Sequence, residues 1–169
     1  MSEFKKTSAC DIEENLIRLL SKKWMLITAK NGEKLNTMTA SWGGFGEMWN
    51  KDVAAIVVRP SRYTFDFIEK SDYYTLSFFD EAYRDKLTFC GRNSGRIVDK
   101  VKECKFTVCG DEKIAYFDEA KYVFVCKKLY SQNVDMNGFE NEEFAKECYP
   151  DPDIHKMFVG EILYVLKKC

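Results

Sequence analysis

Hydroxyl-bearing side chains alternate with apolar ones between residues 36 and 42 of this sequence. Thr37, Thr39 and Ser41 occupy every second position of the run Asn-Thr-Met-Thr-Ala-Ser-Trp. Alternate side chains of a strand share one face, so this spacing predicts a row of hydroxyls. With a glycine-rich loop at 43–46 beside it, the row could hydrogen-bond a heteroatom-rich ring or a phosphate. Threonine also favours strands through packing alone, so a purely structural explanation stays open.

A possible anion site follows the next expected strand, in the segment Arg-Pro-Ser-Arg-Tyr-Thr at 59–64. Pro60 would stop the strand, and Ser61 is placed to be the N-cap of the helix that follows. Backbone N–H groups at a helix start attract anions, and Arg59 and Arg62 add positive charge. The alternative is an ordinary capped helix with arginines that face solvent.

A third segment, 89–100, combines two glycines with three cations at Arg92, Arg96 and Lys100. The nucleotide P-loop order Gly-x-x-x-x-Gly-Lys-[Ser/Thr] is missing from it, and no Gly-x-Gly-x-x-Gly occurs anywhere in the chain. These absences argue against a Rossmann dehydrogenase.

Seven cysteines and one histidine restrict the metal chemistry that the chain can support. No Cys-x-x-Cys pair occurs, and His155 alone excludes a site that needs two histidines from one chain. We therefore predict no metal site, and we expect most cysteines to be small buried apolar residues. A lone histidine is more often structural than catalytic, which is our expectation for His155. The cysteines are Cys10, Cys90, Cys104, Cys109, Cys126, Cys148 and Cys169.

The composition predicts one soluble globular domain over residues 1–169. Hydrophobic residues make up 46% and charged residues 31% of the chain, and the formal net charge is −1. These values argue against disorder and against a general nucleic-acid binder. No apolar run is long enough to span a membrane, and the first residues lack the apolar core of a signal peptide. We therefore expect a cytoplasmic protein without membrane contact.

Charge is distributed unevenly along the chain. Residues 84–105 hold seven Lys/Arg and three Asp/Glu, whereas residues 135–153 hold seven Asp/Glu and one Lys. Both segments could simply be solvated surfaces. Alternatively, the basic segment serves a phosphate-bearing ligand and the acidic segment meets a basic redox partner.

The elements that would position these groups are mainly strands joined by hairpins. This pattern predicts a mainly β, α+β fold, an antiparallel barrel with helices at its edges, rather than a doubly wound parallel sheet. The expected strands are 24–29, 35–42, 53–58, 73–79, 105–109, 113–117, 121–129 and 157–166, and the expected helices are 11–21, 63–70, 81–104 in two pieces, and 139–148.

Four motifs occur in an order that resembles one known family. They are Asn-Thr-Met-Thr-Ala-Ser-Trp-Gly at 36–43, Val-Arg-Pro-Ser-Arg-Tyr-Thr at 58–64, Ser-Gly-Arg-x-x-Asp-Lys at 94–100 and Gly-Glu-Ile at 160–162. Over residues 15–166 the sequence resembles the flavin reductase-like, FMN-binding split-barrel proteins, with the flavoredoxin type as the nearest branch.

The resemblance implies an antiparallel split β-barrel that forms homodimers and binds FMN, rather than FAD, non-covalently near the subunit interface. It implies an oxidoreductase with NAD(P)H as electron donor, in which the flavin carries the chemistry and no catalytic side chain is required. Two alternatives stay open, an electron-transfer protein reduced by a protein partner and a flavin-binding module without catalysis. Residues expected to line the ring and ribityl chain are Met38, Thr39, Ala40, Ser41 and Trp42; those expected to hold the ribityl and phosphate are Arg59, Ser61, Tyr63 and Thr64, with Ser94, Gly95 and Lys100 closing the site.

Overall fold

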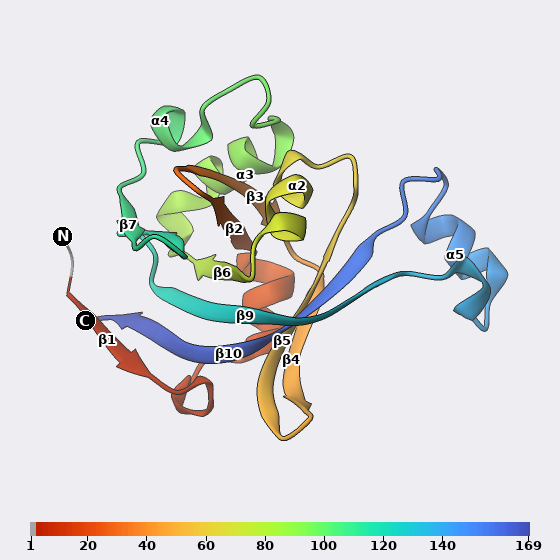
Figure 1. Cartoon of the computed structure of the whole chain (residues 1–169), viewed down its shortest axis with the longest axis horizontal. Coiled ribbons are helices and arrows are strands. Elements are labelled where there is room, and N and C mark those ends of the chain that lie inside the picture. The colour runs from red at the N-terminus through yellow and green to blue at the C-terminus, as the bar shows by residue number, and fades with distance from the viewer. Residues whose placement is uncertain (1–2) are drawn as a thin grey trace.

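The computed structural model describes residues 3–169, and an eight-stranded antiparallel sheet dominates it (Figure 1). The strands of this sheet are β1 (Phe4–Thr7), β2 (Met25–Asn31), β3 (Lys34–Ala40), β4 (Gly43–Met48), β5 (Lys51–Val58), β6 (Tyr73–Phe78), β9 (Tyr122–Asn133) and β10 (Lys156–Lys168). Their order is β3-β2-β6-β9-β10-β5-β4, and β1 pairs with β10 outside this path. A separate hairpin joins β7 (Val108–Gly110) to β8 (Ala115–Phe117).

The helices are short and lie mostly on one side of the molecule. In Figure 1, α2, α3 and α4 gather around β2 and β3, whereas α5 projects at the opposite end. The helices are α1 (Leu16–Arg18), α2 (Tyr63–Lys70), α3 (Arg84–Arg92), α4 (Lys100–Cys104) and α5 (Glu142–Cys148). None of the helices in residues 3–169 is both long and apolar enough to cross a membrane. The predicted antiparallel sheet with flanking helices is confirmed.

The sheet separates two hydrophobic clusters, because neighbouring residues of a strand face opposite sides. On β2, Ile27 belongs to one cluster and Leu26 to the other. On β9, Phe124 and Val123 divide in the same way. Both faces of these strands are therefore buried, which explains why their sequences are continuous apolar runs.

The prediction of a glycine-rich loop at 43–46 is wrong, because these residues begin β4, an edge strand that pairs with β5. Gly43 has φ 153°, and a Cβ added there would lie 2.4 Å from the carbonyl oxygen of Ala55. The missing side chain of Gly43 therefore allows β4 and β5 to pair closely. Three glycines in four residues also remove the side chains that signal a strand.

The first helix starts later than the predicted range 11–21. Asn15 Oδ1 accepts a hydrogen bond from the backbone N–H of Arg18 at 2.9 Å and caps α1, which continues as a π-helical turn to Lys23. Asp11 instead closes a separate 3₁₀ turn, because it forms a capping box with Ser8.

Three other boundaries differ from their predictions by three or four residues. α5 begins at Glu142 rather than 139, because the side chain of Asn141 caps it. β7 begins at Val108 rather than 105, because Lys105 has a left-handed conformation that ends α4. β9 continues to Asn133 rather than 129, since it pairs with the start of β10.

Replacing Gly160 with alanine should destabilise this fold. An added Cβ would lie 2.6 Å from the hydroxyl of Tyr74, a buried side chain that donates a hydrogen bond to the carbonyl oxygen of Ala54 at 2.8 Å. We expect urea titration to show a loss of about 1–3 kcal/mol in the free energy of unfolding. Gly46→Ala is the matched control, because a Cβ there meets nothing within 4 Å. Equal losses in the two variants would contradict this explanation.

Candidate functional site

Two adjoining cavities lie beside the end of β3, the end of β5 and the loop between α3 and α4. Their volumes are about 440 and 210 Å³, and Met38, Arg59 and Arg62 line both. The larger cavity has the size of a small-molecule site. All the predicted binding residues line this pair of cavities. The larger is lined by Arg59, Ser61, Tyr63, Thr64, Ser94, Gly95 and Lys100, and the smaller by Met38, Thr39, Ala40, Ser41, Trp42 and also His155.

Asn36 joins the three segments that surround the larger cavity. Its side-chain amide donates to Thr64 Oγ1 at 2.8 Å, which connects β3 to α2. A Cβ added to Gly95 would lie 2.1 Å from Asn36 Oδ1, so only glycine lets the loop approach this closely. The buried side chains of Asn36 and Thr64 therefore hold one wall of the cavity in place.

Two hydroxyls of the predicted ligand-binding row, those of Thr37 and Thr39, have partners within the protein. Thr37 Oγ1 is buried and donates to the carbonyl oxygen of Ile27 at 3.1 Å. Thr39 Oγ1 donates to the carbonyl oxygen of Leu87 in α3. Both hydroxyls therefore bind the backbone and help to hold the fold together. This agrees with the alternative that these threonines have a structural role. Ser41 keeps a side-chain hydroxyl without a protein partner in the described chain, at the wall of the smaller cavity.

Ser61 is not the N-cap of α2, and that prediction is wrong; the N-cap is Arg62. The Ser61 side chain turns instead toward Asp153, which lies just before β10. Ser61 donates to the Asp153 carboxylate through its hydroxyl and, at 3.2 Å, through its backbone N–H. A carboxylate from a distant segment thus occupies donors that we had expected to serve a ligand.

Arg59 also binds the segment before β10. Its guanidinium donates to the carbonyl oxygen of Asp153 at 2.9 Å and to that of Cys148 at 3.5 Å. It also lies 5.5 Å from the ring centroid of Tyr149. Arg59 therefore fixes residues 148–153 over one edge of the cavities.

Lys100 is buried between β3 and α3. Its ammonium donates to the carbonyl oxygens of Thr37 and Cys90, each at 2.8 Å. Burial lowers the pKa of this group, although nearby Cys90 opposes the shift. Because its donors face two backbone carbonyls, Lys100 shapes the cavity wall.

Arg92, which is absent from the predicted binding set, is a further cation at the larger cavity. It is exposed at the end of α3, lines the larger cavity and has no side-chain partner in residues 3–169. By contrast, Arg62 donates to the Gly91 carbonyl at 3.1 Å, and Arg96 pairs with Asp66 at 2.8 Å. The sequence pointed to Arg92 only through its place in the basic segment at 84–105. Spacing alone could not show that Arg92, rather than Arg96, lacks an acidic partner.

His155 lies in an aromatic group at the smaller cavity. Its Nδ1 is 3.0 Å from the Tyr149 hydroxyl, and its ring centroid is 5.2 Å from that of Trp42. Burial lowers the pKa of His155 to about 4, with the positive charge of Arg59 acting in the same direction. The imidazole is therefore neutral near pH 7.

The buried cysteines are poor nucleophiles in this environment. Cys90 Sγ lies 3.7 Å from Cys104 Sγ, and both residues are buried free thiols. Burial raises the pKa of Cys90 to about 12, with Cys104 adding to the shift, and burial also raises the pKa of Cys126. Since the reactive form is the thiolate, these thiols have little nucleophilic character near pH 7.

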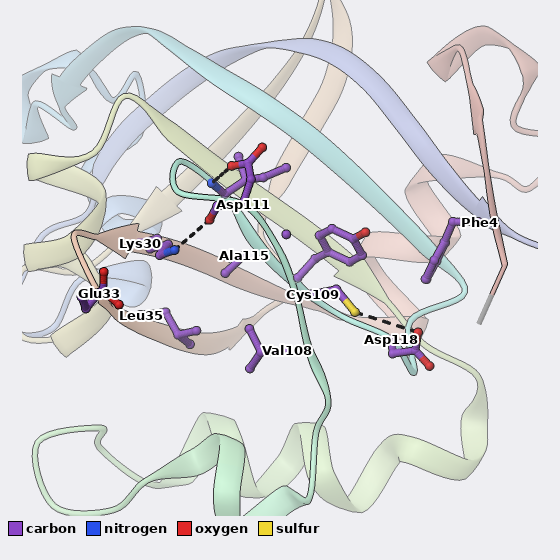
Figure 2. A pocket seen from close by; sticks show the side chains of 12 residues that line it. Phe4, Lys30, Glu33, Leu35, Val108, Cys109, Asp111, Ala115 and Asp118 are labelled. Carbon is purple, nitrogen blue, oxygen red and sulfur yellow. Dashed lines mark hydrogen bonds between the residues drawn. The ribbon is translucent and has the colours of Figure 1, made fainter. Parts of the chain in front are cut away.

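A further hollow of about 570 Å³ lies between the β2–β3 and β7–β8 hairpins (Figure 2). None of the predicted binding residues lines it. Lys30 reaches across to the carbonyl oxygen of Asp111 at 2.7 Å, and Cys109 faces the Asp118 carboxylate. The hollow lacks the several arginines found at the paired cavities, so we place the candidate site at those cavities.

With this fold and site, the chain belongs to the flavin reductase like domain family, whose model matches residues 17–167. The predicted family resemblance is thereby confirmed. No curated protein matches the chain.

Solved structures of flavin-related proteins share the fold. A flavoredoxin from Methanosarcina acetivorans is 21% identical, with a TM-score of 0.67 over 86% of this chain and 68% of that one. An FMN-binding domain of a flavin reductases-like enzyme from Shewanella baltica is 15% identical, with a TM-score of 0.70 over 99% and 78%. The NADH:FAD oxidoreductase SgcE6 from Streptomyces globisporus is 12% identical, with a TM-score of 0.63 over 86% and 75%. These similarities confirm the predicted split-barrel fold.

The stability of the protein should fall as the pH drops from about 6.5 to about 4. Folding holds the pKa of His155 near 4, whereas an unfolded histidine titrates near 6.5. Between these values the unfolded state binds more protons, so the free energy of unfolding rises with pH. His155→Gln should reduce the slope, measured by urea titration at several pH values in this window. The chain has one histidine. If the free energy of unfolding depended on pH equally in both proteins, the lowered pKa of His155 would be contradicted.

Proposed function

We propose that this protein is an FMN-binding oxidoreductase that takes electrons from NAD(P)H. The family supports a flavin-binding, oxidoreductase-type function. The single observation that carries the assignment to a site is the pair of adjoining cavities, one with exposed Trp42 and the other with Arg62 and Arg92. The two adjoining cavities suit a ligand that carries a planar ring at one end and a phosphate at the other.

The residues present fit FMN in chemistry as well as in size. Met38, Ala40 and Trp42 offer apolar contact to a planar ring, and Ser41 offers a free hydroxyl. In the larger cavity, Arg92 and Ser94 suit a phosphate, because arginine binds phosphate through charge-assisted hydrogen bonds. FMN rather than FAD remains our proposal for the cofactor.

When bound, the flavin would supply the hydride and electron transfer itself. The protein's part is to bind and orient the ring and to limit water around it. His155, neutral near pH 7, would pack beside Trp42 at the edge of the smaller cavity and carry no charge there. No side chain is needed as nucleophile or general base.

Protein-mediated electron transfer is the second candidate function, and the shape of the acidic segment favours it. Residues 135–153 include α5 and project from the sheet (Figure 1). Phe144 on this helix is exposed among Glu142, Glu143 and Glu147. An acidic surface with an exposed aromatic side chain is suited to a basic redox partner.

We also propose a homodimer in the cytoplasm. Trp49 lies at the turn between β4 and β5, and its ring centroid is 6.0 Å from that of Tyr130. Both side chains are about half exposed. Met48 and Leu163 are also exposed apolar residues. Exposed aromatic side chains are typical of protein interfaces. Seven free cysteines suit a reducing compartment.

Rapid mixing of the FMN-loaded protein with NADH and with NADPH, without oxygen, tests the proposed donor. We expect flavin absorbance to bleach with at least one of them. Bleaching by neither would overturn the reductase assignment. Reduction by a basic redox protein that slows steeply with salt would then support the second function. Tight FMN binding without reduction by any donor would leave a non-catalytic flavin-binding module.

Arg92→Gln should weaken FMN binding about tenfold and leave riboflavin binding nearly unchanged, because only FMN carries the phosphate. Titration monitored by flavin fluorescence measures both affinities. Lys102→Gln removes an exposed cation of α4 outside both cavities and serves as the control. If Arg92→Gln weakened FMN and riboflavin equally, the phosphate would lie elsewhere.

A further inference from the structure

The two donors of Ser61, in the loop just before α2, already have an anion beside them, the carboxylate of Asp153. Its Oδ1 accepts from the backbone N–H of Ser61 at 3.2 Å, and its Oδ2 accepts from the Ser61 hydroxyl. The two bonds use both oxygens of one carboxylate on a single residue. This geometry matches the way a phosphate oxygen pair would engage the same donors.

Asp153 belongs to a segment, residues 148–155, that is fastened over the cavities at several points. Arg59 donates to the carbonyl oxygens of Cys148 and Asp153 and lies over the ring of Tyr149. Tyr149 in turn meets His155, whose ring packs beside Trp42. The segment therefore reaches from the larger cavity to the smaller one.

A flavin phosphate and the Asp153 carboxylate would compete for the same place. Both carry negative charge, and the Ser61 N–H has one hydrogen to donate. Like charges brought together at such a site oppose binding. Arg92 also lines the larger cavity and has no side-chain partner in the described residues, so a phosphate has a point of first contact that does not involve Asp153.

We propose that Asp153 is an internal competitor for the flavin phosphate, and that FMN binds with Asp153 displaced from Ser61. The inference rests on the proposed function and deepens it. Displacement frees the donors of Ser61 for the phosphate and loosens the 148–155 segment. Because the contacts of Asp153 are lost, the phosphate contributes less free energy to FMN binding. FMN is accordingly held less tightly than it would be without Asp153.

Asp153→Asn separates this role from simple positioning. Asparagine can still accept a hydrogen bond from Ser61, but it carries no charge. We expect FMN to bind about tenfold more tightly and riboflavin to bind within a factor of about two of the original affinity. Asp153→Ala, which removes the hydrogen bonds as well, should change FMN affinity in the same direction.

Asp151→Asn is the matched control. It makes the same charge change two residues away, at an exposed position in the same segment. It should leave both flavin affinities nearly unchanged. A gain as large as that of Asp153→Asn would mean that overall charge, rather than competition at Ser61, controls binding, and the proposal would be overturned.

Two other outcomes also overturn it. Weaker FMN binding in Asp153→Asn would make Asp153 a positioning residue for Ser61. Unchanged FMN binding would put the phosphate out of reach of Asp153. If neither flavin bound the folded original protein, the proposed function itself would fail, which is a different result from normal binding without an effect of Asp153.

Hydrogen exchange adds a readout that does not depend on affinity. Displacement of Asp153 should increase amide exchange in residues 148–155 when FMN is added, whereas riboflavin should not increase it; the Ser61 amide, which the phosphate takes over, should stay protected. Increased protection of residues 148–155 by FMN would contradict displacement.

Discussion

The buried ammonium of Lys100 is the interaction on which the site depends. β3 is an edge strand, and its Thr37 carbonyl has no neighbouring strand on the side that Lys100 occupies. Cys90 lies in the last turn of α3, where carbonyls lack partners within the helix and a cation is favoured. One charge thus satisfies two otherwise costly acceptors and ties β3 to α3. Both walls of the larger cavity are fixed relative to each other by this contact.

Local patterns in the sequence were sufficient for most of the fold. Continuous apolar runs such as 53–58 become strands because both of their faces are buried, and Pro60 ends one of them as expected. The pattern failed at 43–46, where β4 forms through pairing with β5 and close approach at Gly43 rather than through side-chain propensity. Strand pairing of this kind depends on contacts that no short window of sequence contains.

The sequence identified most residues of the candidate site but not the interactions that each of them makes. The motifs at 36–43 and 58–64 name residues that the structure brings together at the two cavities. Their individual bonds were not predictable, because the partner of Ser61 is Asp153, some 90 positions further along the chain. Nor could spacing show that Arg96 is neutralised by Asp66 while Arg92 is left without a partner.

The two ends of the sheet order, β3 and β4, are consecutive in the chain and separated only by Ser41 and Trp42. The sheet therefore curls until its first and last strands meet at a corner without forming a ladder between them. That corner is a seam, and both connecting residues line the smaller cavity. Because no backbone hydrogen bonds between β3 and β4 are found in residues 3–169, widening of this corner would break no ladder. Every other junction between neighbouring strands of this sheet would lose backbone hydrogen bonds if it opened.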